Sequence, residues 1–288
     1  MGLRINQNIA AMNSYRNLSV TDGQMSKSLE KLSSGFRINR AADDAAGLSI
    51  SEGLRSQVGG LKVAVRNAQD GIGVIQTAEG ALTEVHSILQ RMRDLSVQAA
   101  SSGSNDTDAL AASNTEFQEL GKELTRIAKT TTFGSQNLLD GSYSGDFQVD
   151  WKNTTSDEGK FNVTIDNGTA TKGVSATDLG VDAEDLTAAG GAATALGKVD
   201  DAIKLVSTTR AKLGAYQNRL EHTINNLNVS VENLSASESR IRDTDMAAEM
   251  VSFTRSQILS QAGTSMLSQA NQAPQRSLAA PLNAITTE

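Results

Sequence analysis

Residues 33–50, SSGFRINRAADDAAGLSI, hold the densest set of side chains that could do chemistry. Two arginines, Arg37 and Arg40, precede the adjacent carboxylates Asp43 and Asp44. A catalytic carboxylate pair must face one substrate, but adjacent positions on a helix point about 100° apart. We therefore exclude a catalytic pair in this stretch.

The same stretch has the features of a joint between two helices. Gly35 suits the left-handed C-cap of a preceding helix. Asn39, Asp43 and Asp44 can then cap the following segment, because carboxylates are stabilised at a helix N-terminus. Gly47 and the alanines beside it permit close approach of a packing partner.

No other motif supports an enzyme, a metal site or a cofactor site. The chain has no cysteine, and its two histidines, His86 and His222, each lack a second histidine one helical turn away. The GIG sequence at residues 71–73 is followed by Gln76, where the dinucleotide fingerprint needs glycine. P-loop, G-x-S-x-G and calcium-loop patterns are also absent from the sequence. We predict no catalytic residue, no metal and no cofactor.

Composition excludes further classes of function. The net charge is −7 and the pI is about 5.0, which argues against a nucleic-acid partner because phosphate binding needs a basic surface. No apolar run reaches the length of about 18 residues typical of a membrane span, so we expect no membrane insertion. Aromatic residues make up only 3%, which fits long thin helices better than a thick globular core.

Two apolar seams at heptad spacing predict long helices. The first fits one helix over residues 57–100, and the second belongs to a helix that includes residues 213–241. A shorter helix fits residues 109–130. The chain has no proline before Pro274, so no proline interrupts these helices. The seam positions are Leu61, Val65, Ala68, Ile72, Ile75, Ala78, Leu82, Val85, Leu89 and Met92, then Leu213, Leu220, Ile224, Leu227, Val231, Leu234 and Ile241.

The two chain ends form another matched pair of amphipathic segments, residues 4–34 and 246–272. Because a lone amphipathic helix is marginal in water, we expect both ends to become ordered on assembly. The fold is expected to be mainly α, a long coiled-coil-like helical rod built from both chain ends, with a small β-hairpin region. The expected packing positions are Ile5, Ile9, Met12, Met25, Leu29 and Leu32, with Met246, Met250, Phe253, Ile258, Leu259, Ala262, Met266 and Leu267.

The β-hairpin is expected in the middle of the chain. FQVDW at residues 147–151 and KFNVTID at residues 160–166 alternate as strands do, with NTTSDEG between them as the turn. Residues 187–197, rich in glycine and alanine, are expected to be a loose connector into the C-terminal helix.

Both ends of the chain resemble the terminal regions of bacterial flagellin. The matching stretches include MGLRINQNIAAMNSYRNL and EKLSSGFRINRAADDAAGLSISEGLRSQ, and LGAYQNRLEHTINNLNVSVENLSASESRIRDTDMAAEM near the C-terminus. The resemblance covers roughly residues 1–140 and 200–275, without a large outer variable domain between them.

The resemblance implies two domains, each built from both halves of the chain. Residues 1–42 and 246–288 would form an inner-tube domain of paired terminal helices. Residues 43–245 would form the rod-like outer domain, with a β-hairpin and loop insert at about 141–195. The tail at 276–288 departs from the usual end of the family, and the resemblance assigns it no role.

The resemblance implies a structural subunit that self-assembles into the extracellular filament of the bacterial flagellum for swimming motility. It further implies export of the unfolded chain through the flagellar secretion channel, which agrees with the absence of a secretory signal pattern at the start of this sequence. The implied partners are copies of the same chain, a flagellar export chaperone, the filament cap and hook-associated proteins. A hook–filament junction protein of the same family is the alternative. An enzyme inserted in such a frame is a third hypothesis, for which the middle segment offers no motif.

The resemblance also gives candidate contacts with host receptors. Arg91, Leu95 and Glu116 match the segment contacted by the Toll-like receptor that senses flagellin in animals. Arg91 and Leu95 are one helical turn apart and could share a face.

A second group of candidates lies in the joint. Asp43, Asp44 and Gly47 match key positions of the segment sensed by the plant flagellin receptor. Arg37 and Arg40, with the two aspartates, are candidate contacts between subunits.

Overall fold

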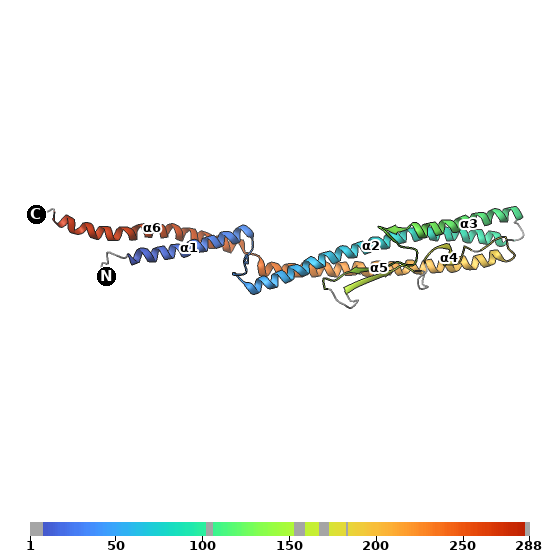
Figure 1. Ribbon diagram of the computed structural model, residues 1–288, viewed down its shortest axis with the longest axis horizontal. Helices are drawn as coiled ribbons and strands as arrows, with labels where there is room; N and C mark the ends of the chain where they lie inside the picture. The colour runs from blue at the N-terminus through green and yellow to red at the C-terminus, as the bar shows by residue number, and fades with distance from the viewer. Residues whose placement is uncertain (1–7, 102–105, 153–158, 167–172, 183, 286–288) are drawn as a thin grey trace. The chain divides into compact units, whose positions relative to one another are not determined.

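The computed structural model describes residues 8–101, 106–152, 159–166, 173–182 and 184–285, with side chains described as far as residue 272 (Figure 1). The helices are α1 (Ile9–Ser34), α2 (Ala45–Ala100), α3 (Thr107–Thr130), α4 (Ala176–Leu179), α5 (Gly191–Arg242) and α6 (Met246–Ile285). The strands are β1 (Thr132–Phe133), β2 (Gln136–Asn137), β3 (Ser144–Gln148) and β4 (Lys160–Thr164). The expected fold class, mainly α with long helices and a small β-hairpin region, is confirmed.

The chain divides into two compact units, each assembled from segments far apart in the sequence. The terminal unit comprises residues 1–56 and 234–288, and the central unit comprises residues 57–233. Helices α2 and α5 each contribute to both units. At about 1.5 Å per residue, α2 is about 84 Å long.

In the terminal unit, α1 and α6 pack side by side and antiparallel. Asn8 caps the start of α1 by accepting a hydrogen bond from the Ala11 amide, and Gly35 ends it with φ of 76°. Contacts at successive levels fix one register. They are Asn8 Nδ2 to the Ala270 carbonyl at 2.8 Å, Ser260 Oγ to Asp22 Oδ1 at 2.9 Å, and Lys31 Nζ to Glu249 Oε2 at 3.6 Å.

The seam between α1 and α6 is made mostly of small side chains. The shielded positions recur at alternating steps of three and four residues on both helices, which is the heptad pattern. Gly263 faces Leu18 so closely that an added Cβ would lie 3.3 Å from Leu18 Cδ1. The shielded positions are Ala11, Ser14, Leu18, Thr21, Met25, Ser28 and Leu32 on α1, and Glu249, Phe253, Ser256, Ser260, Gly263, Leu267 and Ala270 on α6.

This seam corrects the packing positions expected from the sequence. Met25, Leu32, Phe253 and Leu267 do lie in it, but most of the other large apolar side chains point outward, because small residues allow the two helices to approach closely. Ile5 lies outside the described residues. The expected seam residues that are exposed are Ile9, Met12, Leu29, Met246, Met250, Ile258, Leu259, Ala262 and Met266.

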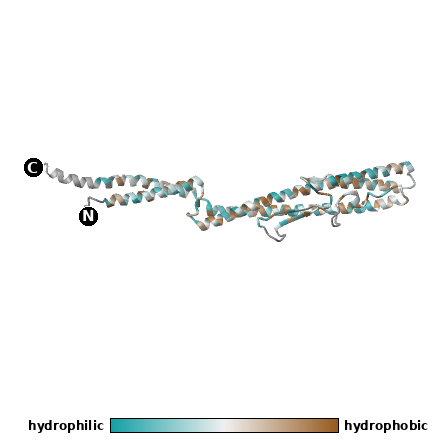
Figure 2. Cartoon of the chain, viewed as in Figure 1, coloured by the Kyte–Doolittle hydropathy of each residue, from teal (hydrophilic) through white to brown (hydrophobic). Residues whose placement is uncertain are grey.

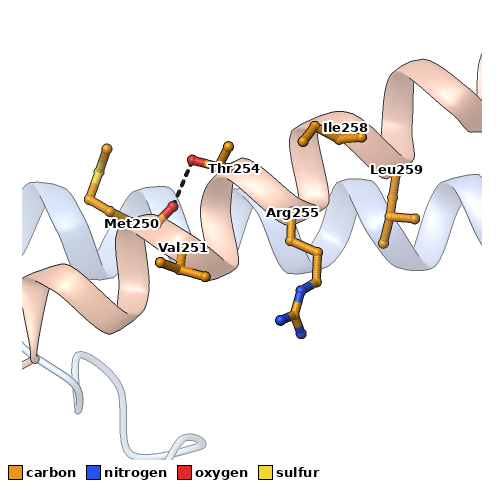
Figure 3. Close-up of a pocket in the computed structure, with 6 residues that line it drawn as sticks. All are labelled: Met250, Val251, Thr254, Arg255, Ile258 and Leu259. Atoms are coloured by element: carbon orange, nitrogen blue, oxygen red, sulfur yellow. Dashed lines mark hydrogen bonds between the residues drawn. The ribbon is translucent and has the colours of Figure 1, made fainter.

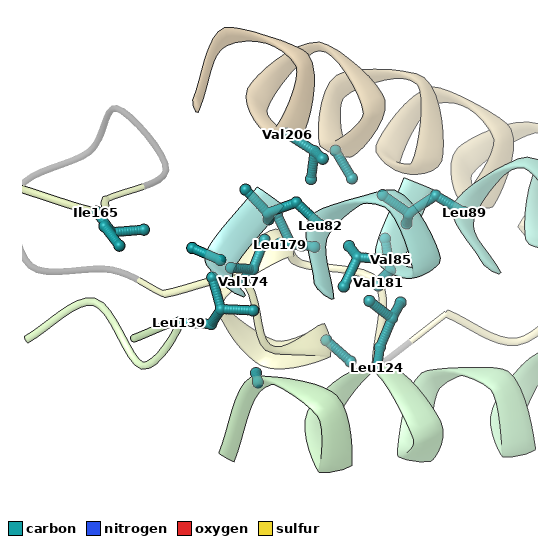
Figure 4. Packing of buried hydrophobic residues seen from close by; sticks show 14 of the residues in the cluster. Leu82, Val85, Leu89, Leu124, Leu139, Ile165, Val174, Leu179, Val181 and Val206 are labelled. Atoms are coloured by element: carbon teal, nitrogen blue, oxygen red, sulfur yellow. The ribbon is translucent and has the colours of Figure 1, made fainter. Parts of the chain in front are cut away.

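In the central unit, α2, α3 and α5 pack around a continuous apolar core. Figure 4 shows side chains of these helices meeting the loops that carry Leu139, Ile165 and Val174. The α2 and α5 helices are antiparallel neighbours, since Arg210 pairs with Glu79 at 2.7 Å and Arg93 pairs with Asp200 at 2.7 Å. The two predicted heptad seams are confirmed, with buried positions that include Leu61, Ala68, Ile75, Ala78, Leu82, Val85, Leu89, Met92, Leu213, Leu220 and Leu227.

The predicted hairpin is present as the antiparallel pair β3–β4, in which Phe147 lies opposite Phe161. Its first strand is Ser144–Gln148 and not residues 147–151 as predicted. Its turn at residues 153–158 lies outside the described part of the chain. A second short hairpin, β1–β2, turns at Gly134 with φ of 61° and was not predicted. The expected connector at 187–197 is wrong over most of its length, because α5 already begins at Gly191 and buries Ala192 and Ala195 in the core.

The closeness of α1 and α6 can be measured with an engineered disulfide in this cysteine-free chain. A Cβ added to Gly263 would lie 3.8 Å from Leu18 Cβ, within the range of about 3.5–4.5 Å found in disulfides. We expect Leu18→Cys with Gly263→Cys to form an intramolecular bond under mild oxidation, seen as a faster band on a non-reducing gel.

The matched control pairs Leu18→Cys with Thr264→Cys, whose Cβ is turned about 100° away on the helix. Equal cross-linking of both pairs in the monomer band would contradict the seam described here.

Candidate assembly surface

The terminal unit exposes large apolar side chains on both of its helices. On α6 they form a stripe, here the α6 stripe, that includes Met250, Val251, Ile258 and Leu259. In Figure 3, Met250 and Ile258 lie along the upper edge of the helix and Leu259 points to the lower edge. Ile258 is 60% exposed. Figure 2 shows such hydrophobic positions, in brown, interleaved with hydrophilic ones along both helices.

A corresponding α1 stripe consists of Ile9, Met12 and Tyr15, three residues apart on α1. Met12 and Tyr15 are each 66% exposed, and all three line a shallow groove together with Leu267 of α6. Exposed apolar patches of this kind mark interaction surfaces. Each large apolar side chain that a partner covers would add about 1.5–3 kcal/mol of stabilisation.

The joint at residues 35–44 is tied to the end of α5 and to the short link before α6 by backbone hydrogen bonds. Arg37 N donates to the Arg242 carbonyl at 2.6 Å, and Thr244 N donates to the Gly35 carbonyl at 2.9 Å. The Arg37 guanidinium donates to the Ile241 carbonyl at 2.7 Å. These hydrogen bonds hold the α1–α2 connection beside the α5–α6 connection within the terminal unit.

Arg242 completes this joint, and sequence reasoning missed it. Its guanidinium carbon lies 4.7 Å from the centre of the Phe36 ring, and its Nη1 lies 2.6 Å from Glu52 Oε1. No short-range pattern links these positions, which are up to 206 residues apart in the sequence. The contact could be found only from the fold.

Of the three residues predicted to cap the segment after the joint, only Asp44 does so, because Asp43 accepts from amides that precede it and Asn39 Nδ2 donates to the Phe36 carbonyl. Asp44 Oδ1 accepts a hydrogen bond from the Gly47 amide at 2.8 Å, at the start of α2. Asp43 Oδ2 accepts from the Arg40 amide at 3.1 Å, and this hydrogen bond is the largest of the causes that lower the pKa of Asp43. A Cβ on Gly47 would lie 2.8 Å from Ile38 Cδ1, so the close neighbour of this glycine is the chain itself.

The two arginines predicted to pair between subunits have partners within the chain. Arg40 Nε lies 2.9 Å from Glu30 Oε1, and Arg37 binds the Ile241 carbonyl as described above. The Arg40–Glu30 pair is well exposed, so its contribution to stability is small.

The three candidate contacts for the animal receptor occupy different environments. Arg91 Nε donates to Glu116 Oε1 at 2.7 Å across α2 and α3, and both side chains are about half exposed. Leu95 is only 2% exposed and belongs to the core. In this structure Arg91 and Glu116 are accessible to a partner, whereas Leu95 is not.

The described residues contain no cluster of three or more potential metal ligands among histidine, cysteine, aspartate and glutamate. His86 Nε2 lies 3.0 Å from Gln90 Nε2, one turn further along α2. Among the same residues, no helix is long and apolar enough to cross a membrane.

Comparison with known proteins gives one family. The model of the bacterial flagellin N-terminal helical region matches residues 5–144, and that of the bacterial flagellin C-terminal helical region matches residues 196–279. The flagellin of Bacillus subtilis (strain 168) is 48% identical over 301 residues, covering 96% of this chain and 99% of that protein. The flagellin of Halalkalibacterium halodurans is 50% identical over 272 residues, covering 94% and 97%. The crystal structure of Bacillus cereus flagellin is similar at 30% identity and a TM-score of 0.46, covering 56% of this chain and 88% of that one.

The Arg91–Glu116 pair makes a testable pKa prediction. The hydrogen bond from Arg91 holds the pKa of Glu116 below its usual range, so the stabilisation exists above the usual glutamate pKa and is lost as pH falls through the lowered value. Arg91→Ala should return the pKa of Glu116 toward its ordinary value, measured by carboxyl NMR titration.

Arg93→Ala is the control for this titration, because Arg93 pairs with Asp200 instead. A Glu116 titration that is identical in the native chain and in Arg91→Ala would contradict the pair.

Proposed function

Because this chain belongs to the bacterial flagellin family and is a structural subunit of the flagellar filament, not an enzyme, we propose that burial of the α1 and α6 stripes against neighbouring copies drives its polymerisation. The family role in motility follows from that identity. The observation that supports the proposal is the packing of the terminal unit, in which small residues occupy most of the seam and most of the large apolar residues outside it are exposed.

Ordering and polymerisation are coupled in this proposal. Only five of the fourteen seam side chains are large and apolar, and an isolated pair of amphipathic helices gains limited stability from so few. Neighbouring copies would supply the missing burial, which favours the ordered helices in the polymer over those in the monomer. On this basis we assign residues 1–42 and 246–288 to an inner-tube domain and residues 43–245 to the outer domain.

The relatives favour the filament over the hook–filament junction. The two most similar proteins described above are both named flagellin and match this chain over more than 90% of its length. We also propose that the chain is exported unfolded through the flagellar secretion channel and functions outside the cell. Its proposed partners are an export chaperone, the filament cap and hook-associated proteins. The family membership supports this proposal.

Ile258→Asp tests the role of the α6 stripe. The substitution leaves the seam intact but places a charge where a neighbour would bury an apolar side chain. Loss of about 1.5 kcal/mol or more of burial corresponds to at least a tenfold rise in the critical concentration for polymerisation. Sedimentation of polymer grown from seeds measures that concentration.

Ile258→Met is the matched control for this substitution, since it keeps an apolar side chain of similar size. If Ile258→Asp polymerised at the critical concentration of the native chain, the α6 stripe would not be part of the interface between subunits.

We also propose that monomers engage innate immune receptors, with Arg91 and Glu116 as the direct contacts for the animal Toll-like receptor. Their exposure and their position on adjacent helices support this. Arg91→Ala with Glu116→Ala should lower receptor signalling by roughly tenfold, because two charged contacts of about 0.7 kcal/mol each are lost. Lys122→Ala with Glu119→Ala, an exposed pair on α3 alone, is the control, and equal signalling by both variants would refute the assignment.

For the plant receptor, we propose Asp43, Asp44 and Gly47 as residues of the recognised segment. In the folded chain both carboxylates bind backbone amides of the joint. Recognition of this segment therefore requires either an unfolded joint or contact through the remaining carboxylate lone pairs.

A further inference from the structure

We propose that a basic groove across α1 and α6 binds carboxylate side chains of a second copy of this chain. The groove is lined by Lys27, Ser28 and Lys31 of α1 and by Glu249, Arg255 and Ser256 of α6, among others. This inference rests on the polymerisation proposed above and gives it an electrostatic component that the apolar stripes lack.

Two of the three cations in the groove, Lys27 and Arg255, make no ion pair among the described residues. Lys31 Nζ lies 3.6 Å from Glu249 Oε2, so the carboxylate of Glu249 is already paired with Lys31. Across the described residues, neither Lys27 nor Arg255 makes an ion pair or a hydrogen bond. Lys27 is close enough to Asp43 to help lower the pKa of that carboxyl, whereas Arg255 has no ion-pair partner among the described residues. The groove therefore carries positive charge that Glu249 alone does not compensate.

Two serine hydroxyls add donors between these cations. Ser28 and Ser256 are each only 6% exposed. Hydroxyls on these helices commonly donate to the carbonyl one turn back, as Thr21 and Thr254 do. The hydroxyls of Ser28 and Ser256 make no hydrogen bond within the described part of the chain.

Hydroxyl donors that line a groove between ammonium and guanidinium groups suit a carboxylate. An ionised carboxylate has only acceptor sites, about four of them, and charge-assisted hydrogen bonds to it are the strong ones. A cationic or purely apolar partner would leave these donors unsatisfied on binding, which carries a penalty.

The charge distribution of the chain points to a second copy as the source of the carboxylates. The terminal unit has eleven lysines and arginines against ten acidic residues, whereas the central unit has fifteen against twenty-three. The surplus of acidic groups thus lies in the part of the chain that does not contain the groove. Within a polymer, copies of that part are at high local concentration.

The groove is also continuous with the proposed assembly surface. Arg255 lines both the groove and the α6 stripe, and Figure 3 shows its side chain between those of Val251 and Leu259. A neighbour that covers Val251 and Leu259 would bring its own side chains within reach of this guanidinium.

Lys27→Gln with Arg255→Gln tests the groove. Removing both charges should raise the critical concentration for polymerisation about tenfold at low salt, the effect of two ion pairs of about 0.7 kcal/mol each. Added NaCl should raise the critical concentration of the native chain, because salt screens such pairs, and should affect the double variant much less.

Two control variants distinguish an effect of the groove from an effect of changed net charge or of impaired folding. Arg55→Gln with Arg240→Gln removes the same charge from the same unit and should polymerise like the native chain. Lys27→Arg with Arg255→Lys keeps the charge and should also behave natively. If the charge-preserving variant were impaired as strongly as the glutamine variant, charge would not be the cause and the inference would fail.

The remaining outcomes also decide the question. An unchanged critical concentration and salt dependence in the glutamine variant would overturn the groove while leaving the apolar stripes in place. Binding of inorganic phosphate by the native monomer, together with native polymerisation of the glutamine variant, would assign the groove to a small anion instead. Failure of the native chain itself to polymerise from seeds would refute the coupled assembly on which the inference rests.

Discussion

The close packing of small residues between α1 and α6 is the constraint on which the rest of the terminal unit depends. Alanine, serine, threonine and glycine occupy most of the seam, and Leu18 lies directly against Gly263. Two helices that approach so closely leave room for few large side chains between them, such as Leu18, Met25 and Phe253. Most of the other large apolar residues of both helices consequently lie outside the seam, where a neighbouring molecule can cover them. A filament subunit needs such a surface, because its assembled state must be more stable than its isolated state.

The joint fixes the register in which that seam forms. A short backbone bridge holds Phe36 beside Asp243, and Arg242 links Phe36 to Glu52 through its guanidinium. The joint contains most of the chemically active groups that stand out in the sequence, yet those groups cap helices and bind backbone amides and carbonyls. Its arginines and aspartates make contacts within the chain, and the cations that we propose to bind a second copy, Lys27 and Arg255, lie in the groove between α1 and α6. Apolar burial and electrostatic attraction then act on adjacent parts of one surface, the first supplying affinity and the second favouring one alignment.

Much of the fold could be predicted from the sequence because long heptad patterns are local signals. Residues such as Leu82, Val85 and Leu89 recur at helical spacing, and all are buried as expected. The joint was equally readable, since Gly35 and Asp44 act through the backbone of their own neighbours. The start of α5 was misjudged because Gly190–Gly191 and the alanines beside them have the composition of a loop, whereas packing of Ala192 and Ala195 against the core stabilises a helix there.

The sequence by itself determined the family, the helical class and the absence of any recognisable catalytic motif, because each of these depends on residue order and spacing along the chain. Only the tertiary structure decided which face of each terminal helix is internal. A stripe of large apolar residues has the same period as a stripe of small ones, and hydrophobicity favours the first as the seam. Close approach of α1 and α6 places the stripe of small residues in most of the seam. This arrangement depends on how two segments that are distant in the sequence pack against each other. The same reason placed Leu95 in the core and Arg91 on the surface, and brought Lys27 and Arg255 to one groove from opposite ends of the chain.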